Sequence, residues 1–212
     1  MVTGSEPADA ANAAAWQAEG PNLVFAGDNL PTMRALPGGA FRLIYLDPPF
    51  NSGRVQSRQT TRAVRRPGAG RLGFQGRSYD LVRGQVTSYD DSFADYWAFL
   101  EPRLEQAWRL LADDGTLYLH LDYREVHYAK VLLDAMCGRE SFLNEIIWAY
   151  DYGARSKSRW PAKHDNILVY VKDPKNYFFA ADAVDREPYM APGLVTAEKA
   201  ARGKLPTDVW WH

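Results

Sequence analysis

Residues 43–50 read Leu43-Ile44-Tyr45-Leu46-Asp47-Pro48-Pro49-Phe50. Four apolar or aromatic residues in a row, followed by a charged residue and two prolines, are typical of a short buried strand that ends in a turn. Because proline has a fixed φ and no backbone N–H, the strand cannot continue far beyond the acid. The stretch therefore predicts a buried strand with a carboxylate at its carboxyl end.

A second apolar run precedes this stretch. Leu23-Val24-Phe25 ends at Gly27-Asp28 and predicts another buried strand. Residues 29–36, between the two runs, are long enough for two helical turns and are closed by Pro37-Gly38-Gly39. A strand, a helix and a strand in succession favour a parallel sheet, so the sequence predicts an α/β fold.

Helical and strand patterns alternate further along the chain. Ser92, with Asp95 three residues later, predicts a helix N-terminus, and apolar residues then recur at helical spacing. Pro102 is expected to kink or divide this helix. A second helix is predicted over 123–136, with Gly138 as its cap. Further strands are predicted over 116–121, 146–148 and 167–171.

The segment 51–88 differs in composition from the rest of the chain. It has eight arginines, no lysine and one acid, Asp80. Frequent glycines and few large aliphatic residues predict a long loop or an insertion. The arginines could follow DNA phosphates; the alternative is an exposed loop in an arginine-biased sequence. A smaller basic loop lies over 155–159, and it permits the same two interpretations.

The composition limits the classes of protein. The length of 212 residues suits one domain, and the net charge of −1 means that any argument for nucleic-acid binding must be local. A single cysteine excludes an intrachain disulfide and fits a reducing cytoplasm. The sequence has no apolar run long enough for a membrane helix and no secretory signal, so we expect no membrane association and a cytoplasmic location. Residues 1–21 are predicted to be a disordered tail.

The residues at 47–50 suit one kind of chemistry. The Asp47 carboxylate and the Pro48 carbonyl are acceptors, and Phe50 has a flat apolar face. Together they could hold a planar heterocycle by the two N–H groups of an exocyclic amine. Such an amine is a poor nucleophile, but two acceptors favour a pyramidal nitrogen with its lone pair directed at an electrophile. The alternative is a Pro-Pro turn in which Asp47 accepts local backbone bonds.

A series of motifs then resembles the β class of amino DNA methyltransferases, which includes the modification subunits of type III restriction systems. The resemblance covers most of residues 22–212. It implies a Rossmann-like, S-adenosylmethionine-dependent methyltransferase fold with an arginine-rich insertion over 51–88 and a target-recognition region at about 150–205. The matching segments are 27–29, 43–53, 89–93, 114–122, 144–148, 163–168 and 207–211.

The resemblance implies roles for individual residues. Asp47 and the Pro48 carbonyl would hold the target amine, Pro49 would stiffen the turn, and Phe50 would stack on the flipped base. Asp28, Asn29 and Asp47 would bind S-adenosylmethionine. No metal is expected, because the methyl donor is itself electrophilic. DNA is the expected partner, contacted by Arg54, Arg58, Arg62, Arg65, Arg66, Arg155, Lys157 and Arg159.

The resemblance also implies an activity. An initial Asp in this motif favours methylation of adenine N6, because cytosine-N4 members more often begin the motif with Ser. The family's F-x-G-x-G segment should follow the element at 208–211, so we expect the fold to be incomplete at the C-terminus. A second chain or a homodimer would then complete the enzyme. A cytosine-N4 enzyme, or a non-catalytic DNA-binding fragment that is half of a split methyltransferase, is the alternative, in each case in the bacterial cytoplasm at the nucleoid.

Two other candidate sites have simpler interpretations. Cys137 could be a covalent nucleophile, but its place beside Gly138 at a helix end favours a small buried residue. His120, Asp122 and His127 match no established metal-ligand spacing. We interpret His120 as a strand-end residue that lines the cleft.

Overall fold

A computed structural model describes residues 16–65, 71–72, 78–91, 93–153 and 155–211. They divide into two compact units, each described by itself here: one runs up to Phe50 and resumes at Asp95, and the other is Asn51–Ala94. Within the described residues, none of the helices has the length and apolar character needed to cross a membrane.

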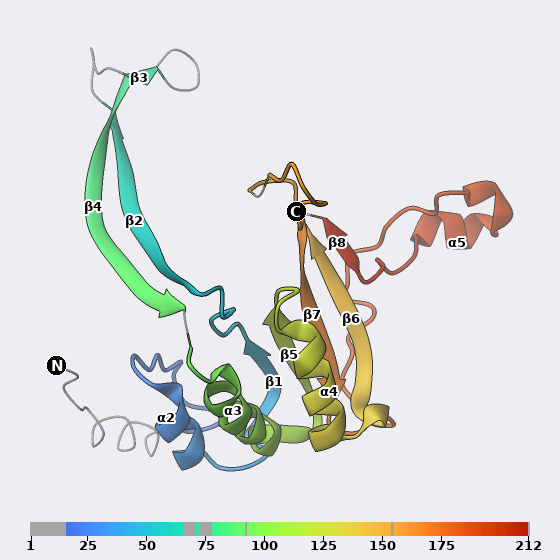
Figure 1. The fold of residues 1–212 in the computed structure, drawn as a ribbon. Coiled ribbons are helices and arrows are strands. Elements are labelled where there is room, and N and C mark those ends of the chain that lie inside the picture. The colour runs from blue at the N-terminus through green and yellow to red at the C-terminus, as the bar shows by residue number, and fades with distance from the viewer. Residues whose placement is uncertain (1–15, 66–70, 73–77, 92, 154, 212) are drawn as a thin grey trace. The chain divides into compact units, whose positions relative to one another are not determined.

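The larger unit is built on a mixed five-stranded sheet (Figure 1). Its strand order is β1-β5-β7-β6-β8, with β1 parallel to β5 and β6 parallel to β8, whereas β7 is antiparallel to both of its neighbours. The strands are β1 (Phe41–Leu46), β5 (Leu111–Leu121), β6 (Phe142–Ala149), β7 (His164–Val171) and β8 (Val209–Trp211). The helices are α2 (Asn29–Ala35), α3 (Tyr96–Leu110), α4 (Val126–Cys137) and α5 (Ala197–Arg202), with short 3₁₀ turns η2 (Arg139–Ser141) and η3 (Pro192–Leu194).

The core of this unit lies between the central strands and the helices. Leucines that alternate along β5, at 117, 119 and 121, are fully buried, and β7 is buried along most of its length. One stripe of α3 is buried as well, through Leu100, Leu104 and Ala107. The predicted α/β fold is therefore confirmed.

Helix α3 begins one turn later than its predicted start. Asp95 is the N-cap, because its side chain accepts a hydrogen bond from the backbone N–H of Ala98 at 3.0 Å. Ser92, the predicted cap, lies outside the described residues. Pro102 does not divide the helix, although its missing N–H removes one hydrogen bond. Leu100 and Leu104 on either side are buried, and their packing holds the helix together.

The predicted strand at 23–25 is wrong. Residues 21–26 have no regular secondary structure, and Val24 is 95% exposed. An apolar run becomes a strand only where a neighbour accepts its backbone hydrogen bonds, and within the described residues β1 pairs with β5 alone. For the same reason β1 is an edge strand and only half-buried, with Leu43 63% exposed, rather than the buried strand that was predicted.

The smaller unit corrects one of the two interpretations of segment 51–88, the long loop. Instead of a long loop, segment 51–88 holds two long antiparallel strands, β2 (Arg54–Arg65) and β4 (Ser78–Asp91), with the short β3 (Arg71–Leu72) beside β4. The ladder extends from Arg54↔Asp91 to Arg65↔Tyr79. The backbone N–H and C=O groups of the two strands are paired in this ladder. The composition of the segment, which is poor in large aliphatic residues, did not reveal these strands. At its base, Asp91 is buried and accepts the N–H groups of Asn51 and Ser52, both at 2.9 Å.

Candidate active site

The register of the sheet brings several strand ends to one edge. Leu46 at the end of β1 lies opposite Leu119 of β5, and Leu121 lies opposite Asn166 of β7. At the same edge β6 ends at Ala149, opposite His164. Asp47 follows β1 directly, so its carboxylate emerges where the other strand ends supply side chains. In open α/β sheets this is the edge at which ligands bind.

Asp47 and Phe50 meet His120 of β5 at this edge. The Asp47 side chain is 60% exposed, and its Oδ1 lies 3.9 Å from His120 Nδ1. The Phe50 ring centroid lies 5.5 Å from that of His120, and on β6 the Trp148 ring stacks on the same imidazole at 5.9 Å. The structure thus places an accessible carboxylate beside three planar rings.

Helix α3 holds the Asp47 turn in place. The Tyr96 O–H donates to the Pro49 carbonyl at 2.7 Å, and the Tyr96 side chain is buried. Within the described residues no donor contacts the Pro48 carbonyl. The two acceptors singled out in the sequence, Asp47 and the Pro48 carbonyl, are therefore both available to an incoming N–H donor.

A polar network surrounds His120. The Tyr45 hydroxyl is 2.7 Å from His120 Nδ1, and His120 Nε2 is 3.5 Å from Asp165 Oδ2. Tyr150 donates its O–H to Asp165 Oδ1 at 3.1 Å. Because an Nε2–H facing a carboxylate is favourable, we assign the imidazole proton to Nε2 and the hydrogen bond at Nδ1 to the Tyr45 O–H.

Both tyrosines in this network remain hydrogen-bond donors. Burial raises the pKa of Tyr45, and the nearby Asp47 and Asp165 carboxylates raise it further. Burial, again with Asp165, raises the pKa of Tyr150 to about 12. A phenolate at either position would lie next to carboxylates, so the neutral phenol persists through the physiological range. The network therefore keeps a fixed pattern of donors.

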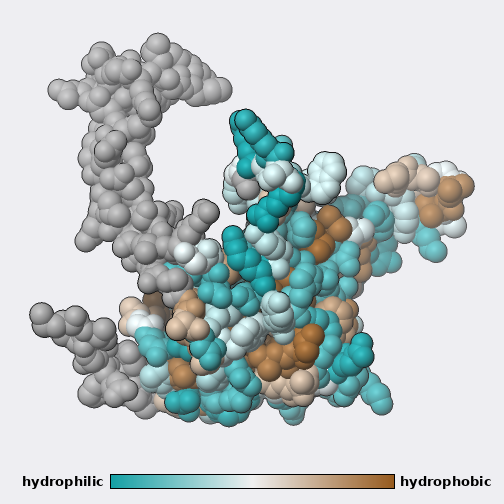
Figure 2. All heavy atoms as spheres, in the orientation of Figure 1, coloured by the Kyte–Doolittle hydropathy of each residue, from teal (hydrophilic) through white to brown (hydrophobic). Residues whose placement is uncertain are grey.

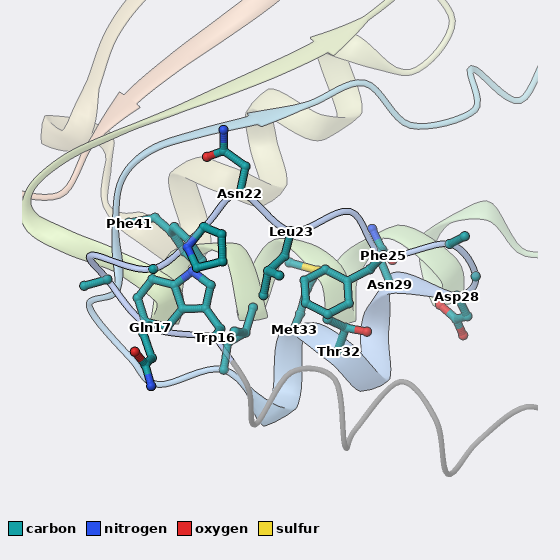
Figure 3. Close-up of a pocket in the computed structure, with 16 residues that line it drawn as sticks. Trp16, Gln17, Asn22, Leu23, Phe25, Asp28, Asn29, Thr32, Met33 and Phe41 are labelled. Atoms are coloured by element: carbon teal, nitrogen blue, oxygen red, sulfur yellow. The ribbon is translucent and has the colours of Figure 1, made fainter.

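Asp28 and Asn29 lie at a different place, at the start of α2. They line a cavity of about 550 Å³ (Figure 3). Leu23, Phe25 and Met33 point toward one another across it, whereas Asn22 points away from it. Trp16 also lines the cavity, in contact with Phe41 at 5.1 Å; residues 1–15 of the predicted tail lie outside the described residues.

Arg103 fixes the polar end of this cavity. Its guanidinium binds Asp28 Oδ1 at 2.7 Å and Asn29 Oδ1 at 2.9 Å, and it stacks over the Phe99 ring at 3.8 Å. Asp28 also caps α2 by accepting the N–H of Leu30 at 3.0 Å. Asp47, the third predicted cofactor ligand, does not line this cavity. The structure therefore separates the three residues into two places.

Helix α3 connects these two places. Tyr96, which holds the Pro49 carbonyl, and Arg103, which holds Asp28, are seven residues apart, or roughly 10 Å along the helix axis. Phe99 lies between them, in contact with both. Sequence reasoning missed both functions of α3. The available signal was the spacing of Tyr96 and Arg103, seven residues apart and therefore on the same side of the helix. Helical spacing does not reveal which groups these side chains bind.

The predicted DNA-contacting residues lie on two elements. Four of them, Arg54, Arg58, Arg62 and Arg65, are on β2, where only the backbone is described, and Arg66 lies outside the described residues. The other three, Arg155, Lys157 and Arg159, are exposed in the loop between β6 and β7. Of the predicted target-recognition range of about 150–205, residues 164–171 form β7 inside the sheet.

The sequence also raised Cys137 and a group of His120, Asp122 and His127 as candidates. Cys137 ends α4, and burial raises the pKa of its thiol to about 12, so at neutral pH it is no nucleophile. Among the described residues, no three His, Cys, Asp or Glu side chains lie together in a way that could hold a metal ion. His120 does line the edge at Asp47, as its position at the end of β5 suggested.

Comparison with known proteins identifies the family. Residues 41–212 match the DNA methylase family of N6 and N4 methyltransferases, so the chain belongs to that family. It is 31% identical over 160 residues to the type II methyltransferase M.EcaI of Enterobacter cloacae, which covers 73% of this chain and 30% of that protein. It is 27% identical over 188 residues to the DNA adenine methyltransferase YhdJ of Escherichia coli strain K12, covering 87% of this chain and 50% of that protein.

One solved structure is similar in outline. It is the cytosine-N4-specific PvuII DNA methyltransferase, with a TM-score of 0.46 and 11% identity, covering 89% of this chain and 56% of the other. The chain thus spans from about a third to about half of the length of the relatives named here.

Proposed function

We propose that this protein transfers a methyl group from S-adenosylmethionine to the exocyclic amine of adenine in DNA. The observation that carries the proposal is the Asp47 turn. Its carboxylate is 60% exposed at the edge of the sheet where ligands bind, next to the Phe50, His120 and Trp148 rings and to a Pro48 carbonyl that no donor among the described residues contacts. Membership of the DNA methylase family connects this arrangement to a nucleobase.

The residues of the α2 cavity suit the nucleoside part of the donor. Its volume of about 550 Å³ is within the range of small-molecule sites. Phe25, Leu23 and Met33 offer apolar surface to a purine ring, and Asp28 and Asn29 offer oxygen acceptors at one end. Arg103 holds those oxygens in place and offsets the Asp28 charge. We propose Asp28 and Asn29 as donor ligands, with Asp47 at the reacting end.

The chain's own groups would perform the remaining work. Bound S-adenosylmethionine supplies an electrophilic methyl group on a sulfonium. Asp47 accepts one N–H of the target amine and the Pro48 carbonyl accepts the other, which directs the nitrogen lone pair out of the ring plane. Phe50 stacks on the base, and Tyr96 fixes the turn through Pro49. The proton that the amine loses passes to the exposed Asp47 carboxylate and from there to water.

The basic segments would bind the DNA itself. Arg155, Lys157 and Arg159 are exposed in the loop that leaves β6 at the same edge as Asp47, and β2 carries four more arginines in the smaller unit. We propose that they contact phosphates, which positions the duplex without reading its sequence. The target base then leaves the duplex to reach Asp47. Such a protein would work in the cytoplasm, on the DNA of the nucleoid.

The decisive experiment is methyl transfer by the full chain. It would be incubated with DNA and labelled S-adenosylmethionine, and the DNA digested to nucleosides for mass spectrometry. We expect N6-methyl-2′-deoxyadenosine as the modified nucleoside. N4-methylcytosine instead would support the cytosine alternative, and absence of any methylated base would contradict the proposed activity of this chain.

A further inference from the structure

Trp160 is an unusual side chain for a protein surface. It is 94% exposed, more than any of the other six tryptophans. A tryptophan normally buries most of its large apolar area, and leaving it in water is unfavourable. Unlike Trp211 on β8, it belongs to no strand or helix whose packing could explain its position. Its exposure therefore points to a binding partner.

The surroundings of Trp160 are strongly basic. Residues 155–163 contain four cations, at 155, 157, 159 and 163, and no acid. Arg155, Lys157 and Arg159 are exposed together with Trp160. The loop forms the hydrophilic projection at the upper centre of the surface view (Figure 2). An aromatic ring among arginines and lysines suits a polyanion that also has flat apolar faces, which is what a nucleic acid offers.

The loop presents Trp160 on an ordered backbone. Ser156 Oγ accepts the N–H groups of Ser158 and Arg159 at 3.3 and 3.1 Å. Lys163 donates from Nζ to the carbonyls of Asp151 and Tyr152 at 3.1 and 3.0 Å. Pro161 restricts the backbone of Trp160 to extended conformations. The indole is therefore held outward by its own loop, and binding would cost little further ordering.

The position of the loop connects Trp160 to the candidate active site. The loop joins β6 to β7 at the edge where Asp47 emerges. The Arg159 guanidinium lies 3.4 Å from the hydroxyl of Tyr123, two residues beyond the end of β5. Asp165, shortly after the loop, lies beside His120 and thus near Asp47. A duplex whose base reaches Asp47 would lie along this edge.

We infer that Trp160 inserts its indole into the DNA base stack, at the gap left when the target base leaves the duplex. This rests on the proposed DNA substrate. Unstacking a base exposes the faces of its neighbours, and a flat apolar ring can replace the missing stacking partner. Arg155, Lys157 and Arg159 would hold the flanking phosphates while the indole fills the gap. Trp160 would thus stabilise the flipped state and take no part in methyl transfer.

The test compares two short fluorescein-labelled duplexes of the same mixed sequence. One is fully paired, and the other has an abasic residue in place of one adenine. Because the gap is already open in the abasic duplex, we expect the full chain to bind it roughly tenfold more tightly, the order of one base–aromatic stack. Trp160→Ala should remove this preference and leave the affinity for the paired duplex nearly unchanged. Trp160→Phe should retain most of the preference.

Two controls distinguish the wedge from general contact. Phe178→Ala removes another exposed ring, at the opposite edge near Asp114, and should keep the preference. The double variant Arg155→Gln, Lys157→Gln should lower the affinity for both duplexes equally. The proposed insertion of Trp160 would be overturned if Trp160→Ala keeps the preference for the abasic duplex, or if it lowers the affinity for both duplexes equally. If the unmodified chain binds neither duplex, the proposed DNA substrate is contradicted as well. If the unmodified chain binds both duplexes equally and still transfers methyl groups normally, only the insertion of Trp160 is contradicted.

Discussion

At the scale of the residue, the site depends on how exposed each polar group is. Asp47 is open to solvent, whereas the Asp165 side chain is mostly buried and accepts a hydrogen bond from Tyr150. Of the two carboxylates near His120, Asp47 is therefore an accessible acceptor, and Asp165 is held inside the protein. This difference supports the proposal that Asp47 is the carboxylate that contacts the substrate.

We predict that Asp47→Asn lowers the rate of methyl transfer by at least about 100-fold, because the amide replaces a charged acceptor with a weaker one. DNA affinity should stay within about twofold, since phosphate contacts supply most of it. Single-turnover transfer and fluorescence anisotropy measure the two quantities. The matched control is Asp182→Asn, which changes an exposed acid outside the candidate site. A near-normal single-turnover rate for Asp47→Asn would remove the residue from the mechanism.

Cys137 offers a test of burial. Because burial raises the pKa of its thiol to about 12, very little thiolate exists at pH 8. We predict that a disulfide reagent reacts with the folded chain roughly a thousandfold more slowly than with the chain unfolded in urea. Cys137 is the chain's one cysteine, so Cys137→Ser gives the blank. Equal rates in the folded and unfolded states would show that the thiol is accessible.

At the scale of the element, α3 organises the candidate site. Asp95 begins the helix, Tyr96 holds the Asp47 turn, and Arg103 holds the polar end of the α2 cavity. A rigid helix therefore sets the spacing between the two places. Helices position functional groups more precisely than loops do, which explains why residues remote in sequence can act together.

The β2–β4 hairpin is the second element with a testable role. We predict that replacing Arg58, Arg62 and Arg65 with Gln flattens the plot of log K against log salt for DNA binding, by about 0.9 for each phosphate that is no longer neutralised. The affinity would be measured over a series of salt concentrations. The control is a variant with Gln at Arg139, Lys175 and Arg202 of the larger unit, which removes the same number of positive charges. An unchanged slope for the hairpin variant would mean that these arginines face away from DNA.

At the scale of the whole molecule, the larger unit has a core of its own. Its buried apolar residues include Leu100, Leu104, Leu117 and Leu119. The hairpin begins with the pair Arg54↔Asp91, and Asp91 holds the backbone of Asn51 and Ser52. The larger unit can therefore keep its core without the rest of the hairpin.

We predict that replacing residues 55–90 with an Asn-Gly turn, which preserves the Arg54↔Asp91 pair, shifts the unfolding midpoint by less than about 4 °C. DNA affinity at low salt should fall, because the arginines of β2 are removed. Circular dichroism and anisotropy measure the two effects. A chain that no longer unfolds cooperatively would show that the hairpin belongs to the core.

Local patterns by themselves determined much of this protein. Residues 43–50 predicted a strand followed by an acidic turn, and the helical periodicity after residue 92 predicted α3 apart from its cap. These features depend on side-chain period and on proline, which act within a few residues. The ordered motifs also indicated the family, which the match over residues 41–212 confirmed.

Only the tertiary structure decided which residues meet. Tyr45, His120 and Asp165 are far apart in sequence, and the register of β1, β5 and β7 brings them together. Pairing also decided against a strand at 23–25 and in favour of the hairpin at 54–91, because backbone hydrogen bonds need a neighbour that no local pattern specifies. A side chain's partners depend on strand order and register, which are properties of the whole sheet.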